Sequence, residues 1–117
     1  MYQIYHNPRC RISRKVLDEI KLTDAAFEIK EYLKEIPTVK ELKVLLMKLH
    51  MTPLQIVRQN EEIFKKKFKG KNFSDEEWLQ IIHENPVLIE RPIVVKKNKA
   101  VICRSPEKFN ESFLISK

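Results

Sequence analysis

Apolar residues recur along this chain with two different periods, and the changes between them predict the order of its secondary-structure elements. The segments 2–5, YQIY, and 26–32, AFEIKEY, both alternate in the manner of a strand. Between them, residues 11–21 carry apolar side chains at helical spacing, namely Ile12, Val16, Leu17 and Ile20. A strand, a helix and a strand in this order predict a right-handed crossover that joins two parallel strands.

Residues 38–84 are predicted to be mostly helical, because start and stop signals divide this region into successive helical segments. The first of these segments has a continuous apolar face, formed by Val39, Leu42, Leu45, Leu46 and Leu49. The signals are, in chain order, a Thr38–Glu41 capping box, a stop near His50, a start at Thr52-Pro53, a Ser74–Glu77 capping box and a stop at Asn85-Pro86. The middle of the chain is therefore expected to be a helical insert.

The C-terminal part returns to strands and closes with a helix. The sequence RPIVVKKNKAVIC, residues 91–103, has two β-branched runs around a polar turn at Lys97-Asn98 and predicts a hairpin. Ser105-Pro106 then opens a last helix that carries Phe109 and Phe113. The whole order, β-α-β, helical insert, β-hairpin and C-terminal helix, predicts an α/β protein with a thioredoxin-like mixed sheet.

Length and composition limit what this chain is expected to be. Its 117 residues, 43% of them hydrophobic, suffice for one domain with its own core, so residues 1–117 are expected to form a single domain. The apolar runs are too short to cross a membrane, and the N-terminus has no signal-peptide pattern, so a cytoplasmic location is expected. Two cysteines, Cys10 and Cys103, make neither a disulfide framework nor a zinc site.

The net charge of +7 and the isoelectric point near 9.5 favour an anionic ligand or partner. A nucleic acid, an acidic protein and a small oxyanion all fit this charge. A lysine-rich segment around Gly70, which contains Lys65, Lys66, Lys67, Lys69 and Lys71, is interpreted as an exposed loop without a specific role.

The sequence YHNPRCRISR, residues 5–14, places Cys10 where the first strand feeds the first helix. Arg11, Arg14 and Lys15 place cations in the first turns of this helix, where Asp and Glu are usually preferred. Both these cations and the helix N-terminus favour the thiolate form of Cys10. His6 could pair with the Cys10 sulfur, and Ser13 could donate its hydroxyl to it. Cys10 is therefore the predicted nucleophile, whereas Cys103, at the end of the apolar run AVIC, is expected to pack as a small hydrophobe.

These motifs resemble the glutathione- and glutaredoxin-coupled arsenate reductases over essentially the whole chain. The resemblance rests on YHNPRCRISR, on the Val57-Arg58 pair after a proline-led helix, and on RPIVV followed by CRSPEK. It implies a catalytic set of Cys10, His6 and Ser13, and a substrate-binding set of Arg58, Arg91, Arg104, Asn7 and Arg14. Arg11 departs from the family pattern, which more often has a small residue directly after the cysteine.

The resemblance also implies partners and chemistry. Three guanidinium groups would neutralise an arsenate and hold it in line with the thiolate, and glutathione and glutaredoxin would then reduce the adduct. No bound cofactor or metal, no membrane and no nucleic acid are expected. Pro92, which opens a hairpin strand, is expected to follow a cis peptide bond, as is common in thioredoxin-like folds.

Two other functions remain open at this point. The related Spx-like regulators bind RNA polymerase and respond to thiol stress, although their C-x-x-C switch is absent here because position 13 is a serine. A glutathione-dependent thiol reductase would use the same cysteine and cations. Monothiol glutaredoxins fit less well, because their glycine pair before the last helix has no counterpart in a chain whose one glycine is Gly70.

Overall fold

The computed structural model describes residues 1–115, and the chain divides into two compact units. The first unit contains Met1–Glu35 and the residues from Arg91 onward, and the second contains Ile36–Glu90. The second unit contains the predicted helical insert, residues 38–84, and extends beyond both of its ends. Within residues 1–115, no helix has the length and apolar character needed to cross a membrane.

A four-stranded mixed sheet forms the centre of the first unit. Its strands are β1 (Tyr2–Tyr5), β2 (Phe27–Lys30), β3 (Ile93–Lys96) and β4 (Lys99–Ile102), in the order β2-β1-β3-β4. β1 and β2 are parallel, as the strand-helix-strand order predicts, and β3 pairs antiparallel with both β1 and β4. This arrangement confirms the predicted mixed sheet and the predicted hairpin.

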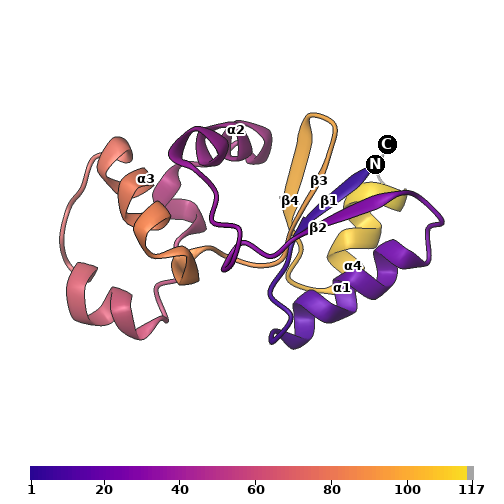
Figure 1. Ribbon diagram of the computed structural model, residues 1–117, viewed down its shortest axis with the longest axis horizontal. Helices are drawn as coiled ribbons and strands as arrows, with labels where there is room; N and C mark the ends of the chain where they lie inside the picture. Colours follow the sequence, from indigo (N-terminus) through magenta and orange to yellow (C-terminus); the bar gives the residue numbers. More distant parts are fainter. Residues whose placement is uncertain (116–117) are drawn as a thin grey trace. The chain divides into compact units, whose positions relative to one another are not determined.

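Two helices cover one face of this sheet, as Figure 1 shows for α1 (Arg11–Lys21) and α4 (Pro106–Phe109). The chain continues from α4 as a π-helix, η4 (Asn110–Ile115). The core between the helices and the sheet is formed by Tyr2, Ile4, Val16, Leu17, Ile20, Val94, Cys103 and Phe109. Burial of each large apolar side chain contributes about 1.5–3 kcal/mol, so this core holds the start of α1 against the end of β1.

Helices make up most of the second unit. They are α2 (Val39–Leu49), the 3₁₀ turn η1 (Pro53–Ile56), the π-helix η2 (Phe64–Phe68), α3 (Asp75–Glu84) and a second 3₁₀ turn, η3 (Pro86–Leu88). Both predicted capping boxes are present, at Thr38 and at Ser74, and they fix where α2 and α3 begin. His50, which directly follows α2, adopts the left-handed conformation that often ends a helix.

The lysine-rich segment is a loop only in part, because Lys69, Gly70 and Lys71 lie in an exposed turn as predicted, whereas the residues before them form η2. Lys65, Lys66 and Lys67 lie on η2 and are exposed, while Phe64 and Phe68 at its two ends pack against Trp78 with ring centroids 6.2 and 6.1 Å away. The two phenylalanines, four residues apart, supply the packing that orders this turn.

Two further elements are shorter than predicted. β2 ends at Lys30 instead of Tyr32, because the chain turns at Glu31, whose carbonyl accepts from the N–H groups of Lys34 and Glu35. The last α-helix, α4, has four residues before the chain continues as η4. Phe109 on α4 and Phe113 on η4 still contact Tyr2, with ring centroids 5.6 and 5.7 Å from that of Tyr2.

Candidate active site

Cys10 lies at the N-terminus of α1, at the end of a tight loop that follows β1. Its backbone N–H donates to the Asn7 carbonyl at 3.0 Å, and its carbonyl accepts from the Arg14 N–H at 3.0 Å. The Asn7 side-chain oxygen accepts from the Arg9 N–H at 3.0 Å. The Arg14 guanidinium donates to the Pro8 carbonyl at 2.8 Å. The side chains of Asn7 and Arg14, which were expected to bind substrate, thus hold the loop that presents the partly exposed thiol.

A buried hydrogen-bonded pair lies beneath this loop. His6 Nδ1 is 2.7 Å from the Ser13 hydroxyl oxygen, which also accepts from the Asn7 N–H at 3.1 Å. Ser13 has no exposed surface and points into the unit, so its hydroxyl meets His6 and Asn7. The Ser13 hydroxyl is thus engaged with His6 and Asn7, and a direct contact of either side chain with the Cys10 sulfur stays a prediction.

The charge state of His6 follows from its surroundings. Burial lowers the pKa of His6, the Glu31 carboxylate opposes this by raising it, and the cations of Arg14 and Lys21 lower it further. The net pKa lies below its ordinary value, so the imidazole is mainly neutral at pH 7. His6 is thus suited to orient Ser13 and adds little positive charge beside the thiol.

The Cys10 thiol is held in an environment that favours its ionised form. Burial raises the pKa of Cys10, but the Ser13 backbone N–H, the Arg91 guanidinium and the Ile12 backbone N–H together lower it by more. The first turn of α1 contains no acidic residue whose carboxylate could accept from these donors in place of the thiolate. The net lowering of the pKa gives a larger thiolate fraction at neutral pH than an ordinary cysteine has.

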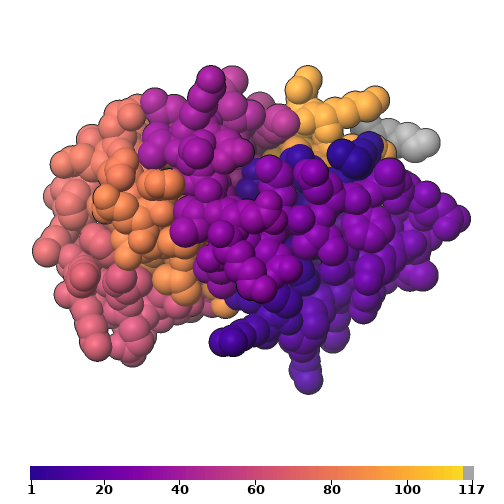
Figure 2. Space-filling model, in the orientation of Figure 1, coloured from indigo at the N-terminus to yellow at the C-terminus, as the bar shows by residue number. Residues whose placement is uncertain are grey.

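Additional cations flank Cys10 along the chain. Arg9 and Arg11, on either side of Cys10, are both exposed. The indigo N-terminal segment that carries them forms part of the molecular surface seen in Figure 2. An anion that approaches the thiol therefore meets a positively charged surface.

Arg91 and Arg104 lie at the same end of the β3–β4 hairpin. The register pairs Ile93 with Ile102, and the Cys103 N–H continues the ladder by donating to the Pro92 carbonyl at 2.9 Å. This brings the backbone of Arg91 opposite that of Arg104. The Arg91-Pro92 peptide bond is cis, the conformation expected from the sequence.

Arg58, the third arginine of the expected set, belongs to the second unit. Its Nε donates to the Glu61 carboxylate at 3.2 Å, and its Nη1 lies 3.9 Å from the Glu90 carboxylate. Two acidic side chains thus share the charge of Arg58. Its place beside Cys10 stays a prediction.

Cys103 is buried in the core of the first unit. Burial raises the pKa of Cys103 to about 12, although the cations of Lys108 and Lys99 oppose the rise. A buried thiol with this pKa is protonated at neutral pH and closed to reagents. The environment of Cys103 matches the inert role predicted from the sequence.

The two thiols are expected to differ sharply in alkylation. Iodoacetamide should modify Cys10 of the native protein while Cys103 stays unmodified, because only Cys10 is both accessible and shifted toward thiolate. The alkylation rate of Cys10 should reach half of its maximum at a lower pH than that of an unperturbed thiol. Peptide mass spectrometry after timed alkylation measures both rates, and comparable modification of Cys103 in the folded state would contradict the assignment.

Replacement of Ser13 by alanine separates positioning from direct activation of the thiol. Ser13→Ala should lower the free energy of unfolding by about 1–3 kcal/mol, because the buried His6 and Asn7 groups lose their shared partner. The thiol pKa should change little, since the Ser13 backbone N–H remains. Urea denaturation and pH-dependent alkylation test this; an unchanged stability with a raised thiol pKa would instead show that the hydroxyl acts on the sulfur.

Sequence reasoning missed four contributors to the site. The backbone N–H groups of Ile12 and Ser13 act on the thiol, and no side-chain pattern identifies a particular amide. Glu31, which follows β2, raises the pKa of His6. The two residues are too far apart in sequence for a local motif to predict this interaction. The pairing of Arg58 with Glu61 was readable from their separation by three residues.

The sheet topology, the cis proline at the start of β3 and the single activated cysteine at the start of α1 define a thioredoxin-like protein with one reactive thiol. The chain matches the ArsC family over residues 5–112. Because this match covers most of its length, the chain belongs to the ArsC family.

Individual relatives agree with this assignment. The chain is 38% identical over 111 residues to the uncharacterized protein YfgD of Escherichia coli, covering 93% of each chain. It is 33% identical over 107 residues to an arsenate reductase of Neisseria meningitidis, covering 90% of this chain and 92% of the relative. The solved structure of an arsenate reductase from Vibrio cholerae superposes with a TM-score of 0.88 at 37% identity, covering 94% and 95% of the two chains.

Proposed function

We propose that this chain is an arsenate reductase-type oxidoreductase in which the Cys10 thiolate attacks a bound arsenate. The observation that carries the proposal is the lowered pKa of the Cys10 thiol, produced beside Arg91 at the N-terminus of α1. The arrangement supports a nucleophile with a larger thiolate fraction at neutral pH than an ordinary cysteine has, next to a cation that can bind an anion. Family membership supports arsenate as the anion, because relatives of similar length are arsenate reductases.

In the first step, the Cys10 sulfur forms a bond to arsenic and one As–O bond breaks. The departing oxygen takes up protons from the solvent and leaves as water. Arsenate carries negative charge that repels a thiolate, so guanidinium groups are needed to neutralise its oxygens. Arg91 beside the sulfur and Arg104 at the same hairpin end are suited to this role, and Arg58 is the third donor of the proposal.

In the second step, a glutathione thiolate attacks the Cys10 sulfur of the adduct. A disulfide forms between Cys10 and glutathione, the S–As bonding pair stays on arsenic, and As(V) is reduced to As(III) and released as arsenite. Glutaredoxin then removes glutathione from Cys10 by thiol–disulfide exchange. An external thiol is required in this scheme, because Cys103 is buried, with its pKa raised to about 12.

Steady-state kinetics test the proposal. With glutathione, glutathione reductase and glutaredoxin present, the protein should oxidise NADPH in an arsenate-dependent manner. Omission of glutaredoxin alone should slow turnover, and omission of glutathione should stop it. If arsenate elicits no signal while the coupling enzymes are active, the arsenate proposal is wrong, and a glutathione-linked disulfide substrate becomes the next to assay with the same Cys10 and Arg91.

A further inference from the structure

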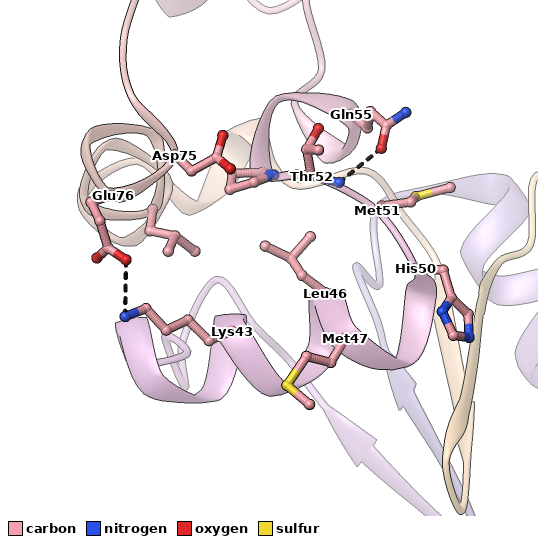
Figure 3. A pocket seen from close by; sticks show the side chains of 11 residues that line it. Lys43, Leu46, Met47, His50, Met51, Thr52, Gln55, Asp75 and Glu76 are labelled. Carbon is pink, nitrogen blue, oxygen red and sulfur yellow. Dashed lines mark hydrogen bonds and ion pairs between the residues drawn. The ribbon is translucent and has the colours of Figure 1, made fainter.

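A wide groove lies within the second unit, and none of the residues proposed to act on arsenate lines it. It is bounded by α2, by the turn from His50 to Gln55, and by the start of α3, and it encloses about 800 Å³ (Figure 3). No step of the proposed reaction uses it.

The floor of the groove is apolar. Leu46 of α2 and Leu79 of α3 are buried beneath it, and Leu46 points to its centre in Figure 3. Met47 and Met51 also line it, and Met47 is 73% exposed although it is a large apolar residue. Flexible thioether side chains adapt to the shape of an apolar partner, so exposed methionines are common on surfaces that bind other polypeptides.

Charged side chains border this floor, and their charges do not cancel. The Lys43 ammonium lies 3.1 Å from the Glu76 carboxylate, and this ion pair links α2 to α3 at one side of the groove. Asp75, on the α3 wall, carries a second carboxylate that has neither a hydrogen bond nor an ion pair with any of residues 1–115. Lys43 thus neutralises Glu76, and Asp75 leaves the α3 wall with a negative charge available to a partner.

We propose that this groove binds a short amphipathic helix of another protein. Apolar side chains of that helix contact Met47 and Met51, and one of its lysines or arginines pairs with Asp75. A helix with apolar residues at three- and four-residue intervals fits a groove between two helices, and its cation complements the α3 wall. A short helix brings few charges besides the cation that pairs with Asp75, whereas a second copy of this chain brings a net charge of +7 and is repelled.

The groove offers a direct way to identify the occupant. The photoreactive residue p-benzoylphenylalanine, placed at position 47 of the full chain in its native cells, should crosslink to one protein. The crosslinked peptide should be a helical segment with an apolar face and a neighbouring Lys or Arg. Absence of any crosslink, a crosslink only to another copy of this chain, or a crosslink to an acidic or non-helical segment would each overturn the proposal.

Binding of the identified segment, as a synthetic peptide, then tests the two contacts. Met47→Glu and Asp75→Lys should each weaken its affinity for the full protein by about tenfold or more. Val44→Glu, on the same helix but outside the groove, and Asp18→Lys, on α1, are the matched controls and should bind as the wild type does. Exchange of the peptide's cation for glutamate should restore binding to Asp75→Lys. Equal loss in the controls, or no rescue by the exchanged peptide, would show that the groove does not recognise the segment.

Discussion

Cys10→Ser should abolish arsenate-dependent turnover, whereas Cys103→Ser should keep most of it. Serine retains the position of Cys10 but cannot form the thiolate or the disulfide that the proposed reaction requires. Cys103 is fully buried, and burial raises its pKa to about 12, so it has no access to arsenate or glutathione. The coupled NADPH assay on both purified variants measures the difference.

Folding must be controlled in this comparison, because Cys103 belongs to the core of the first unit. Cys103→Ala, which adds no buried hydroxyl, is a second variant at the same position, and thermal unfolding reports the stability of each protein. Equal loss of activity in well-folded variants of both cysteines would contradict a single nucleophile and indicate a redox pair.

Arg91→Ala should raise the pKa of the Cys10 thiol and lower kcat/KM for arsenate by about tenfold or more. The guanidinium favours the thiolate both by a hydrogen bond and by its charge, so its loss moves the pKa back toward the ordinary value and reduces the thiolate fraction at neutral pH. A charge-assisted contact to an oxyanion contributes about 1.5–3 kcal/mol, which accounts for the expected loss in efficiency. Alkylation rates against pH measure the first effect, and arsenate kinetics measure the second.

Two further variants separate the effect of Arg91 on the thiol pKa from its effect on arsenate binding. Arg91→Lys should restore the charge but not the two-pronged geometry, and should rescue the efficiency only in part. Arg104→Ala should lower the efficiency and shift the thiol pKa less than Arg91→Ala does, because Arg91 is the guanidinium that acts on Cys10 both by a hydrogen bond and by its charge. An unshifted thiol pKa in Arg91→Ala would contradict the electrostatic description of the site.

The sequence predicted those elements whose signals are local. Thr38 and Ser74 each carry a capping partner three residues later, and α2 and α3 begin where these pairs indicate. The apolar spacing of Val16, Leu17 and Ile20 likewise identified the buried face of α1. β2 was predicted too long because its alternation continues to Tyr32, whereas the backbone turns at Glu31 and buries Tyr32 there.

The candidate site was predictable in composition but not in its hydrogen bonds. Cys10, His6 and Ser13 are close in sequence, so their grouping could be anticipated. The direction of the Ser13 side chain could not, because it depends on which face of α1 packs into the core. Glu90, one of the two acidic partners of Arg58, shows the same limit, since the antiparallel bridge between Val57 and Ile89 brings it close to Arg58.

One single-turnover measurement tests the central claim, that Cys10 transfers the electrons of a thiol to arsenate. The reduced protein is incubated with glutathione and arsenate, without glutaredoxin, and its intact mass and modified peptide are determined. We expect a mass increase of one glutathionyl group on Cys10 and release of arsenite, with neither product when phosphate replaces arsenate. Failure to form arsenite, or glutathionylation that is independent of arsenate or located on Cys103, would contradict that claim.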